Sequence, residues 1–385
     1  MAARKQFLKR IITTAVACGA IAFASGAAHA QSMGMDMDSI SQFMKYLPPL
    51  IKNVTQEPET PKQGDAVKIT ANVDRIHFAD DIETVDSVKL SYTYDGEKWE
   101  TIDMEQGDDK VNWTCEIPAP GDCTEVDYRI TAVDSAGNIA MELPQWIATA
   151  GWDGNADNPP YQYLTKIYDH VNSERSEIPD EMQIGEIPPY LDIQTVWFGF
   201  DDKNYYFKIQ FGEKMQQGTI SPVDANLYIL AIINCSLETI DNAATDLGLK
   251  QGFKNFDPSN PMVQELVKYF WGWYYAPLLD IVPPLPGIGK IPGVGLIHID
   301  PANIKTPIFE KTGFKHKLNG NNLELSVSRS FVGNAQDDTM TFLAGDVKAE
   351  GADMTSIKPK IGDISYTTTI IMRDHAYDSC GRPLE

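Results

Sequence analysis

The chain has 385 residues, with 32 Lys and Arg side chains against 54 Asp and Glu, which gives a formal net charge of −22. Such an acidic surface repels nucleic acid and anionic lipid, so both are excluded as general partners. The length allows two or three domains with ordinary hydrophobic cores.

Residues 1–30 have the pattern of a secretory signal peptide. Basic residues come first, an apolar run extends from Ile11 to about Ala24, and Ala28-His29-Ala30 is a small-x-small cleavage site. We expect cleavage after Ala30 and a periplasmic or extracellular protein. No later segment is long and apolar enough to span a membrane without interruption by proline or charge.

Residues 31–50 form an amino-terminal arm in which Met33, Met35 and Met37 alternate with other residues. Thioether sulfur can bind copper(I), but no histidine stands beside these methionines. We therefore interpret the arm as a tail that leads into a short helix from about Asp38 to Tyr46.

Residues 51–148 carry about seven short β signals separated by turns. Alternating runs begin at Ala66 and at Val85, with Asp95-Gly96 as one turn and Ser135 to Asn138 as another. This strand spacing is typical of an immunoglobulin-like β-sandwich. The segment "VDYRITAVDSAGN", residues 126–138, resembles fibronectin type III and bacterial immunoglobulin-like modules, with Tyr128 in the place of their corner tyrosine. The resemblance implies a spacer or docking module.

Residues 149–190 read as a linker rich in loops. Within it, Asp153, Asn155 and Asp157 place oxygen side chains at alternate positions, a spacing that can surround a hard cation such as calcium. The pattern is not an EF-hand, because the glycine at the sixth place and the distal glutamate are missing. A turn without an ion is the alternative.

Residues 191–385 indicate a second antiparallel sandwich. It opens with "LDIQTVWFGFDDKNYYFKIQF", two β-forming runs joined by a polar tetrapeptide, and Asn319-Gly320 later joins two more alternating runs. In the first hairpin, alternation places Tyr205, Phe207, Ile209 and Phe211 in the core. Trp197 and Tyr206 then face away from the core, toward the insertion or a ligand.

An insertion, residues 243–300, interrupts this sandwich. Asn260 is a helix cap, Pro261 suits the first helical position, and the apolar spacing continues to Trp271, so we expect a helix that ends in aromatic residues. A Pro/Gly-rich apolar stretch follows. The fold class predicted for the whole chain is mainly β, with two antiparallel sandwiches, the second carrying this helical and Pro/Gly-rich insertion.

Three stretches of the second half, "GWDGNADN", the hairpin at 191–211 and "LELSVSRSFVG", resemble in order the family 9 carbohydrate-binding-module-like fold. That group also contains the DOMON domains. The resemblance implies a β-sandwich that binds a sugar, binds haem b in an electron-transfer subunit, or has no ligand.

Four cysteines remain after the expected cleavage: Cys115, Cys123, Cys235 and Cys380. An even number in an exported protein indicates disulfide bonds. Cys115 and Cys123 bracket a segment that turns easily, so we expect them to pair locally, which leaves Cys235 with Cys380 by elimination. A metal site is disfavoured, because the chain has no CxxC motif and no His at ligand spacing.

We therefore expect an exported, non-catalytic protein that binds a glycan or a cell-surface protein through the second sandwich. Sugar sites need aromatic faces and a few polar groups, and the candidates are Trp271, Trp273, Tyr274 and Tyr275, with Trp197 apart from them. The alternative for these aromatics is that they fill the sandwich. The absence of GxSxG, HExxH and phosphate-binding glycine loops disfavours an enzyme.

Two other functions stay open. A haem b-binding periplasmic subunit would draw its ligands from the methionines and histidines of the second half, namely Met215, Met340, Met372, His298, His316 and His375. A structural or assembly protein of the cell surface would use the apolar insertion to dock on a partner.

Overall fold

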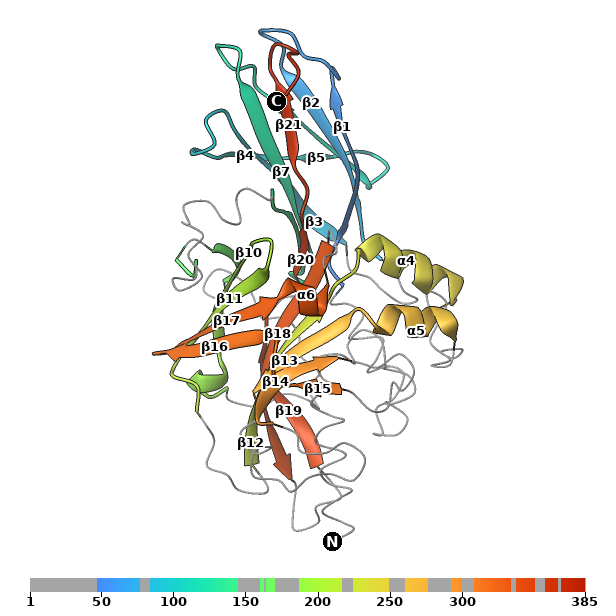
Figure 1. Cartoon of the computed structure of the whole chain (residues 1–385). Helices are drawn as coiled ribbons and strands as arrows, with labels where there is room; N and C mark the ends of the chain where they lie inside the picture. The colour runs from blue at the N-terminus through green and yellow to red at the C-terminus, as the bar shows by residue number, and fades with distance from the viewer. Residues whose placement is uncertain are drawn as a thin grey trace. The chain divides into compact units, whose positions relative to one another are not determined.

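The computed structural model describes residues 47–76, 84–144, 160–162, 164–169, 187–216, 224–248, 260–275, 292–298, 308–333, 337–349, 357–365 and 368–384. These residues form mainly antiparallel β-structure with few helices, which confirms the predicted fold class. They divide into two compact units. The N-terminal unit comprises Leu47–Ile147 and Thr368–Glu385, and the central unit comprises the described residues of Ala148–Thr367 (Figure 1).

The N-terminal unit is a sandwich of two sheets. The first sheet has the order β1 (Leu50–Glu57), β2 (Val67–Asp74), β6 (Asn112–Ile117), β5 (Glu105–Gln106). The second has the order β20 (Thr368–Ile371), β8 (Ile139–Glu142), β7 (Glu125–Asp134), β3 (Val85–Thr93), β4 (Glu100–Asp103), and β21 (His375–Asp378) also pairs with β7.

Alternation along the strands builds one core between these sheets. Every second residue of β7 is buried, and Ile69 of β2 and Leu90 of β3 are fully buried in the same cluster. Each such aliphatic side chain contributes roughly 1.5–3 kcal/mol through burial. The expected turn after β7 is present: the Asp134 backbone N–H donates to the Asn138 carbonyl, and Gly137 has a φ of 85°.

The last strands of the chain belong to this first sandwich. β20 runs parallel to β8. β21 runs antiparallel to β7, beside which it lies in Figure 1. Ile371 and Tyr377 are buried in the same core cluster as the residues of β2 and β3. The sequence pattern predicts residues 368–385 as part of the second sandwich, because alternation identifies a strand but not its partner.

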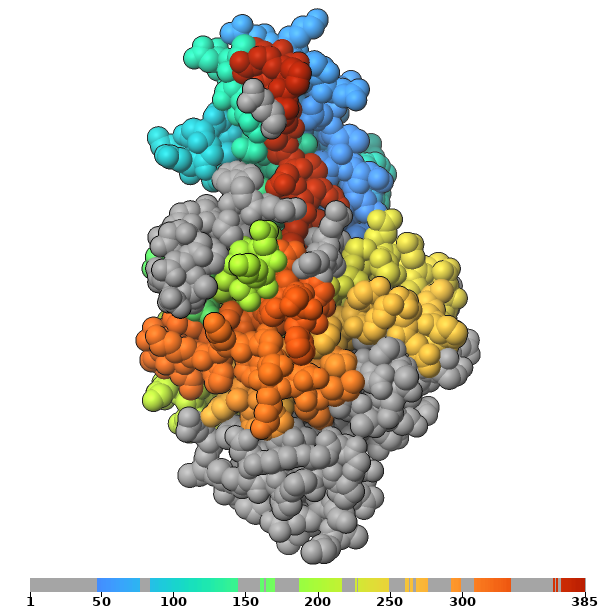
Figure 2. All heavy atoms as spheres, viewed as in Figure 1, coloured from blue at the N-terminus to red at the C-terminus, as the bar shows by residue number. Residues whose placement is uncertain are grey.

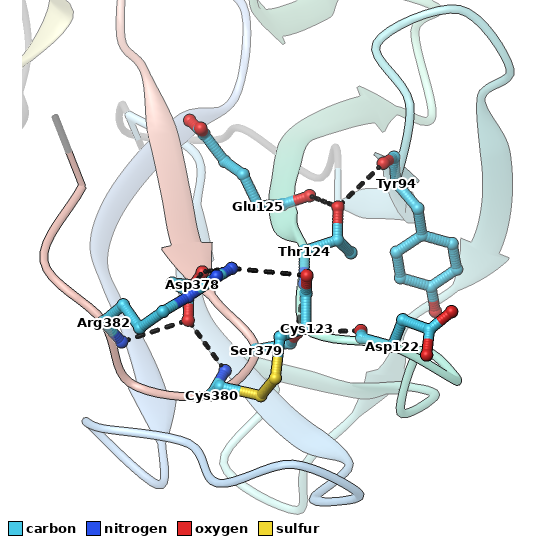
Figure 3. A network of polar contacts seen from close by, with 9 residues as sticks. All are labelled: Tyr94, Asp122, Cys123, Thr124, Glu125, Asp378, Ser379, Cys380 and Arg382. Atoms are coloured by element: carbon cyan, nitrogen blue, oxygen red, sulfur yellow. Dashed lines mark hydrogen bonds and ion pairs between the residues drawn. A yellow bond between two sulfur atoms is a disulfide. The ribbon is translucent and has the colours of Figure 1, made fainter.

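The predicted disulfide pairing is wrong. The bond joins Cys123 to Cys380, whose Cα atoms are 5.4 Å apart, and Cys115 and Cys235 are thiols. Cys115 is held on β6, opposite Ile69 of β2, whereas Cys123 lies in the loop beyond the strand. That loop faces the turn after β21 (Figure 3).

Hydrogen bonds hold the same loop and turn together. The Ser379 backbone N–H donates to the Thr124 carbonyl at 2.9 Å, and the Thr124 N–H donates to Ser379 Oγ at 2.8 Å. Arg382 donates to both the Asp378 carboxylate, at 2.6 Å, and the Cys123 carbonyl, at 3.3 Å (Figure 3). The Arg382 side chain, followed by the backbone N–H groups of Arg382 and Cys380, keeps the pKa of Asp378 well below its usual value.

The central unit also has two sheets. One has the order β16 (Phe314–Asn319), β17 (Asn322–Ser328), β11 (Asn204–Phe211), β10 (Ile193–Phe200), β9 (Thr165–Asp169). The other contains β15 (Ile308–Glu310), β14 (Val294–His298), β13 (Phe270–Tyr275), β12 (Asp224–Ile233), β18 (Asp337–Ala349) and β19 (Ile357–Ile364). The helices are the 3-10 turn η5 (Pro189–Leu191), α4 (Leu237–Asp246), α5 (Pro261–Val267) and α6 (Arg329–Val332).

The hairpin β10–β11 confirms the predicted core. Tyr205, Phe207, Ile209 and Phe211 are all at most 1% exposed. Phe211 meets Tyr228 of β12 edge to face, with ring centroids 5.5 Å apart, so this hairpin packs against the other sheet. The turn predicted at Asn319-Gly320 is present one residue later: Asn319 pairs with Asn322, so Gly320 and Asn321 form the turn, and Gly320 has a positive φ of 62°.

The insertion differs from its prediction. The Asn260 side chain caps α5 as expected, because its Oδ1 accepts the Met262 N–H at 2.9 Å. The helix ends at Val267, however, and the aromatic residues that follow form strand β13 between β12 and β14. Aromatic residues favour a pleated sheet, and here the pairing partners on both sides outweigh the helical spacing. Residues 276–291 lie outside the described residues.

Candidate functional site

The outer face of the five-stranded sheet in the central unit carries a row of directly opposed side chains. The strand register aligns Lys166 of β9, Trp197 of β10, Lys208 of β11, Glu324 of β17 and Lys317 of β16. Directly opposed residues project to the same side of a sheet. The side chains of the next row along the strands, Phe198, Phe207 and Leu325, are fully buried. The row that contains Trp197 therefore projects away from the core.

Trp197 lies at the centre of this row, where it is half-buried. The Lys208 ammonium lies 4.6 Å from the centroid of its ring, within the range of a cation–π interaction. On the other neighbouring strand, Lys166 forms an ion pair with Asp169. One ammonium group, that of Lys208, thus contacts the ring, while Lys166 is opposite Trp197 in register and is paired with Asp169.

Two amide side chains project from the same face. Gln210 of β11 is directly opposite Asn322 of β17, two residues along from the Lys208–Glu324 pair, and both are half-buried. Each amide offers two N–H donors and a carbonyl acceptor. Residues 308–333, which include β16 and β17, reach the molecular surface (Figure 2). The face therefore combines a planar ring, ammonium donors and amides.

Tyr206, predicted to face away from the core, does so and is nevertheless buried. Tyr161 covers it edge to face, with centroids 6.1 Å apart. The Tyr206 hydroxyl donates to Asp201 Oδ2 at 2.8 Å and accepts from the Asn204 amide at 3.2 Å. Burial, then the Asp201 bond, raises the pKa of Tyr206, and burial raises the pKa of Tyr161 to about 12. Both hydroxyls stay neutral at physiological pH. The hydrogen bonds and the ring contact hold Tyr161 and Tyr206 in place beside the outer face of the sheet.

The other predicted aromatic residues lie in the second sheet of the central unit. Trp273 and Tyr274 are 0% and 1% exposed, and the Tyr274 hydroxyl donates to the Pro292 carbonyl. Trp271 packs on His298, with centroids 4.4 Å apart, and Tyr275 packs beside Tyr228 at 6.1 Å. Trp197 alone of the five predicted glycan-binding residues lies on the outer face of the five-stranded sheet.

The predicted calcium loop, with Asp153, Asn155 and Asp157, lies outside the described residues, as do the signal peptide and the arm to Tyr46. Among the residues that the structure describes, no three His, Cys, Asp or Glu side chains gather as metal ligands. The described part of the chain likewise has no helix long and apolar enough to cross a membrane.

The candidate haem ligands lie in different units. His298 and His316 pack near Trp271 and Trp273 in the central unit, where Met215 is also buried. In the N-terminal unit, Met372 is buried, and His375 Nε2 lies 3.0 Å from the buried Glu142 carboxylate. The side chain of Met340 is not among those described. Haem binding therefore stays a prediction, which a visible spectrum of the exported protein would test.

Comparison with known proteins finds no matching family model and no matching curated protein. Among solved structures, the adhesin InvE of Yersinia pseudotuberculosis is 8% identical, with a TM-score of 0.16, and the alignment covers 83% of this chain and 58% of that one. This chain therefore spans less than two thirds of InvE.

Two further similarities are of the same order. A complex of Dpr2 Ig1-Ig2 with DIP-Theta Ig1-Ig3 is 8% identical, with a TM-score of 0.15, covering 85% of this chain and 100% of that one. MtrC of Shewanella baltica is 8% identical, with a TM-score of 0.17, covering 87% and 71%. Neither fold nor function follows from similarities this low.

Proposed function

We propose that the chain is an exported, non-catalytic protein that binds a glycan on the outer face of the five-stranded sheet, with Trp197 at its centre. The observation that carries the proposal is the half-buried Trp197 ring, which projects from the outer face of the sheet with the Lys208 ammonium 4.6 Å from its centroid. The disulfide between Cys123 and Cys380 supports export, because such bonds persist in oxidising compartments.

The chemistry of the face suits a sugar ring. The apolar C–H face of a pyranose can lie on the indole, where it removes apolar surface from water. The amides of Gln210 and Asn322 can both donate to and accept from hydroxyls, and the Lys208 ammonium can donate to a hydroxyl or carboxylate oxygen. A few directional polar groups around an aromatic surface are what orients a small ligand.

Glycan-array binding followed by calorimetry with the best oligosaccharide tests this proposal. Covering roughly 60 Å² of indole at about 25 cal/mol per Å² is worth about 1.5 kcal/mol, so Trp197→Ala should weaken binding about tenfold. Trp197→Phe should keep part of the affinity. Lys208→Gln should weaken binding to acidic glycans more than to neutral ones.

Trp99→Ala is the matched control, because Trp99 also lies 4.6 Å from a cation, that of Arg129, but in the N-terminal unit. It should leave glycan affinity unchanged. Equal loss in Trp99→Ala and Trp197→Ala, or no loss in Trp197→Ala, would contradict the proposed site.

A further inference from the structure

A pocket of about 470 Å³ opens in the N-terminal unit, next to the disulfide-linked loop. Tyr92 at the end of β3 and Tyr94 just after it form one wall, Glu100 at the start of β4 forms the second, and residues 118–124 form the third. None of the sequence motifs pointed to this pocket, because its walls come from three separate segments.

The walls are held in place before any ligand arrives. The Tyr94 hydroxyl donates to the Pro118 carbonyl at 2.6 Å, and Thr124 Oγ1 donates to the Tyr94 carbonyl at 3.2 Å. The Cys123–Cys380 bond and the Ser379 hydrogen bonds tie the far end of the same loop to the turn after β21 (Figure 3). Binding to a preformed pocket costs little ordering of the protein.

The pocket joins an aromatic wall to carboxylates. The rings of Tyr92 and Tyr94 meet edge to face, with centroids 5.3 Å apart, and the Tyr92 hydroxyl donates to Glu100 Oε2 at 2.6 Å. Burial raises the pKa of both tyrosines, so they stay neutral. Glu100 and Asp122 both line the pocket and are exposed, and Glu100 keeps further lone pairs after accepting from Tyr92.

The chain segment that supplies two of the pocket walls is strongly negative. Residues 95–125 carry ten carboxylate side chains, and Lys98 and Lys110 are their only basic residues. A concave site lined by one sign of charge raises the local concentration of the opposite ion. A cation also gains from the face of an aromatic ring within about 6 Å.

We propose that this pocket binds a basic side chain, an arginine or lysine, presented by a protein partner. The Tyr94 ring packs against the cationic group, and the carboxylates of Glu100 and Asp122 accept its N–H donors. A guanidinium fits best, because it can stack on a ring and donate to a carboxylate at the same time. This site lies in the other unit from Trp197 and is independent of the glycan proposal.

The test is an NMR titration of the full exported chain with N-acetyl-arginine methylamide, with the citrulline counterpart as the uncharged control. We expect the arginine compound to shift the backbone amides of Gly121, Cys123 and Thr124 with a roughly millimolar dissociation constant, and the citrulline compound to bind at least fivefold more weakly. The affinity should fall as salt is raised.

Variants locate the site. The double variant Glu100→Gln with Asp122→Asn should weaken arginine binding about tenfold, since it removes both charge partners. Glu97→Gln, a substitution on the same turn but outside the pocket walls, should change it less than twofold. Equal shifts with arginine and citrulline, or equal loss in Glu97→Gln and the double variant, would overturn the proposal.

Discussion

Removal of the Cys123–Cys380 bond is expected to destabilise the N-terminal unit strongly. The two cysteines are 257 residues apart in sequence, so the bond closes a very long loop. The chain-entropy relation puts the stabilisation from such a loop at about 5 kcal/mol, which is an upper value because β20 and β21 already hold the C-terminal segment in place. We therefore expect Cys123→Ser with Cys380→Ser to lower the free energy of unfolding by about 3–5 kcal/mol.

Denaturant unfolding of the oxidised protein, followed by the NMR methyl signals of the buried Ile69 and Leu90, measures this loss in the unit that contains the bond. Cys115→Ser is the matched control. Its thiol is half-buried against the same core, forms no disulfide, and has a pKa raised by burial to about 11, so its loss should cost less than about 1 kcal/mol.

A non-reducing tryptic digest decides the pairing directly. The structure requires residues 111–129 to be linked to residues 374–385, because Cys123 lies in the first peptide and Cys380 in the second. An internally closed peptide 111–129, together with a large stability loss in Cys115→Ser, would refute the reasoning and restore the local pairing.

Three further outcomes follow from the same structure. Glu142→Gln should lower the free energy of unfolding by about 3 kcal/mol, because the buried carboxylate accepts the Ile130 N–H at 2.9 Å and pairs with His375. Thermal or chemical unfolding measures this loss, and an unchanged midpoint would contradict it. Phe198→Ala should lower the free energy of unfolding by about 3–5 kcal/mol, because the ring is fully buried against Phe207. A loss below about 1 kcal/mol would contradict this packing. The pKa of Asp378 is lower in the folded than in the unfolded protein, so its contribution is complete at neutral pH and is lost as the pH falls below the ordinary value of 3.8. The difference in unfolding midpoint between wild type and Asp378→Asn should therefore become smaller from pH 6 to pH 3. A difference that stays constant would contradict the lowered pKa.

Local pattern predicted the hairpins well. The alternation in residues 205–211 identified the buried face, and Asn319-Gly320 identified the turn to within one residue, at a glycine with positive φ. Each of these features depends on residues close together in sequence, so the sequence alone is enough to define it.

The misassigned features depend on partners far along the chain. The spacing that starts at Pro261 fits a helix, yet Phe270–Tyr275 pairs with two strands and becomes part of a sheet. Four cysteines allow three pairings, and only the fold brings Cys380 to Cys123. Trp197 was identified through its outward position in a strand, whereas its lysine neighbours depend on the register of β9, β11 and β16.

The return of β20 and β21 to the first sandwich affects the order in which the protein can fold. Synthesis from the amino terminus presents residues 47–147 long before residues 368–378 emerge. Until then β7 and β8 lack the neighbours that β21 and β20 supply, and the core lacks Ile371 and Tyr377. The sandwich that is synthesised first is thus completed only when the last strands are made, and its unpaired strand edges need protection from aggregation for the whole of that interval.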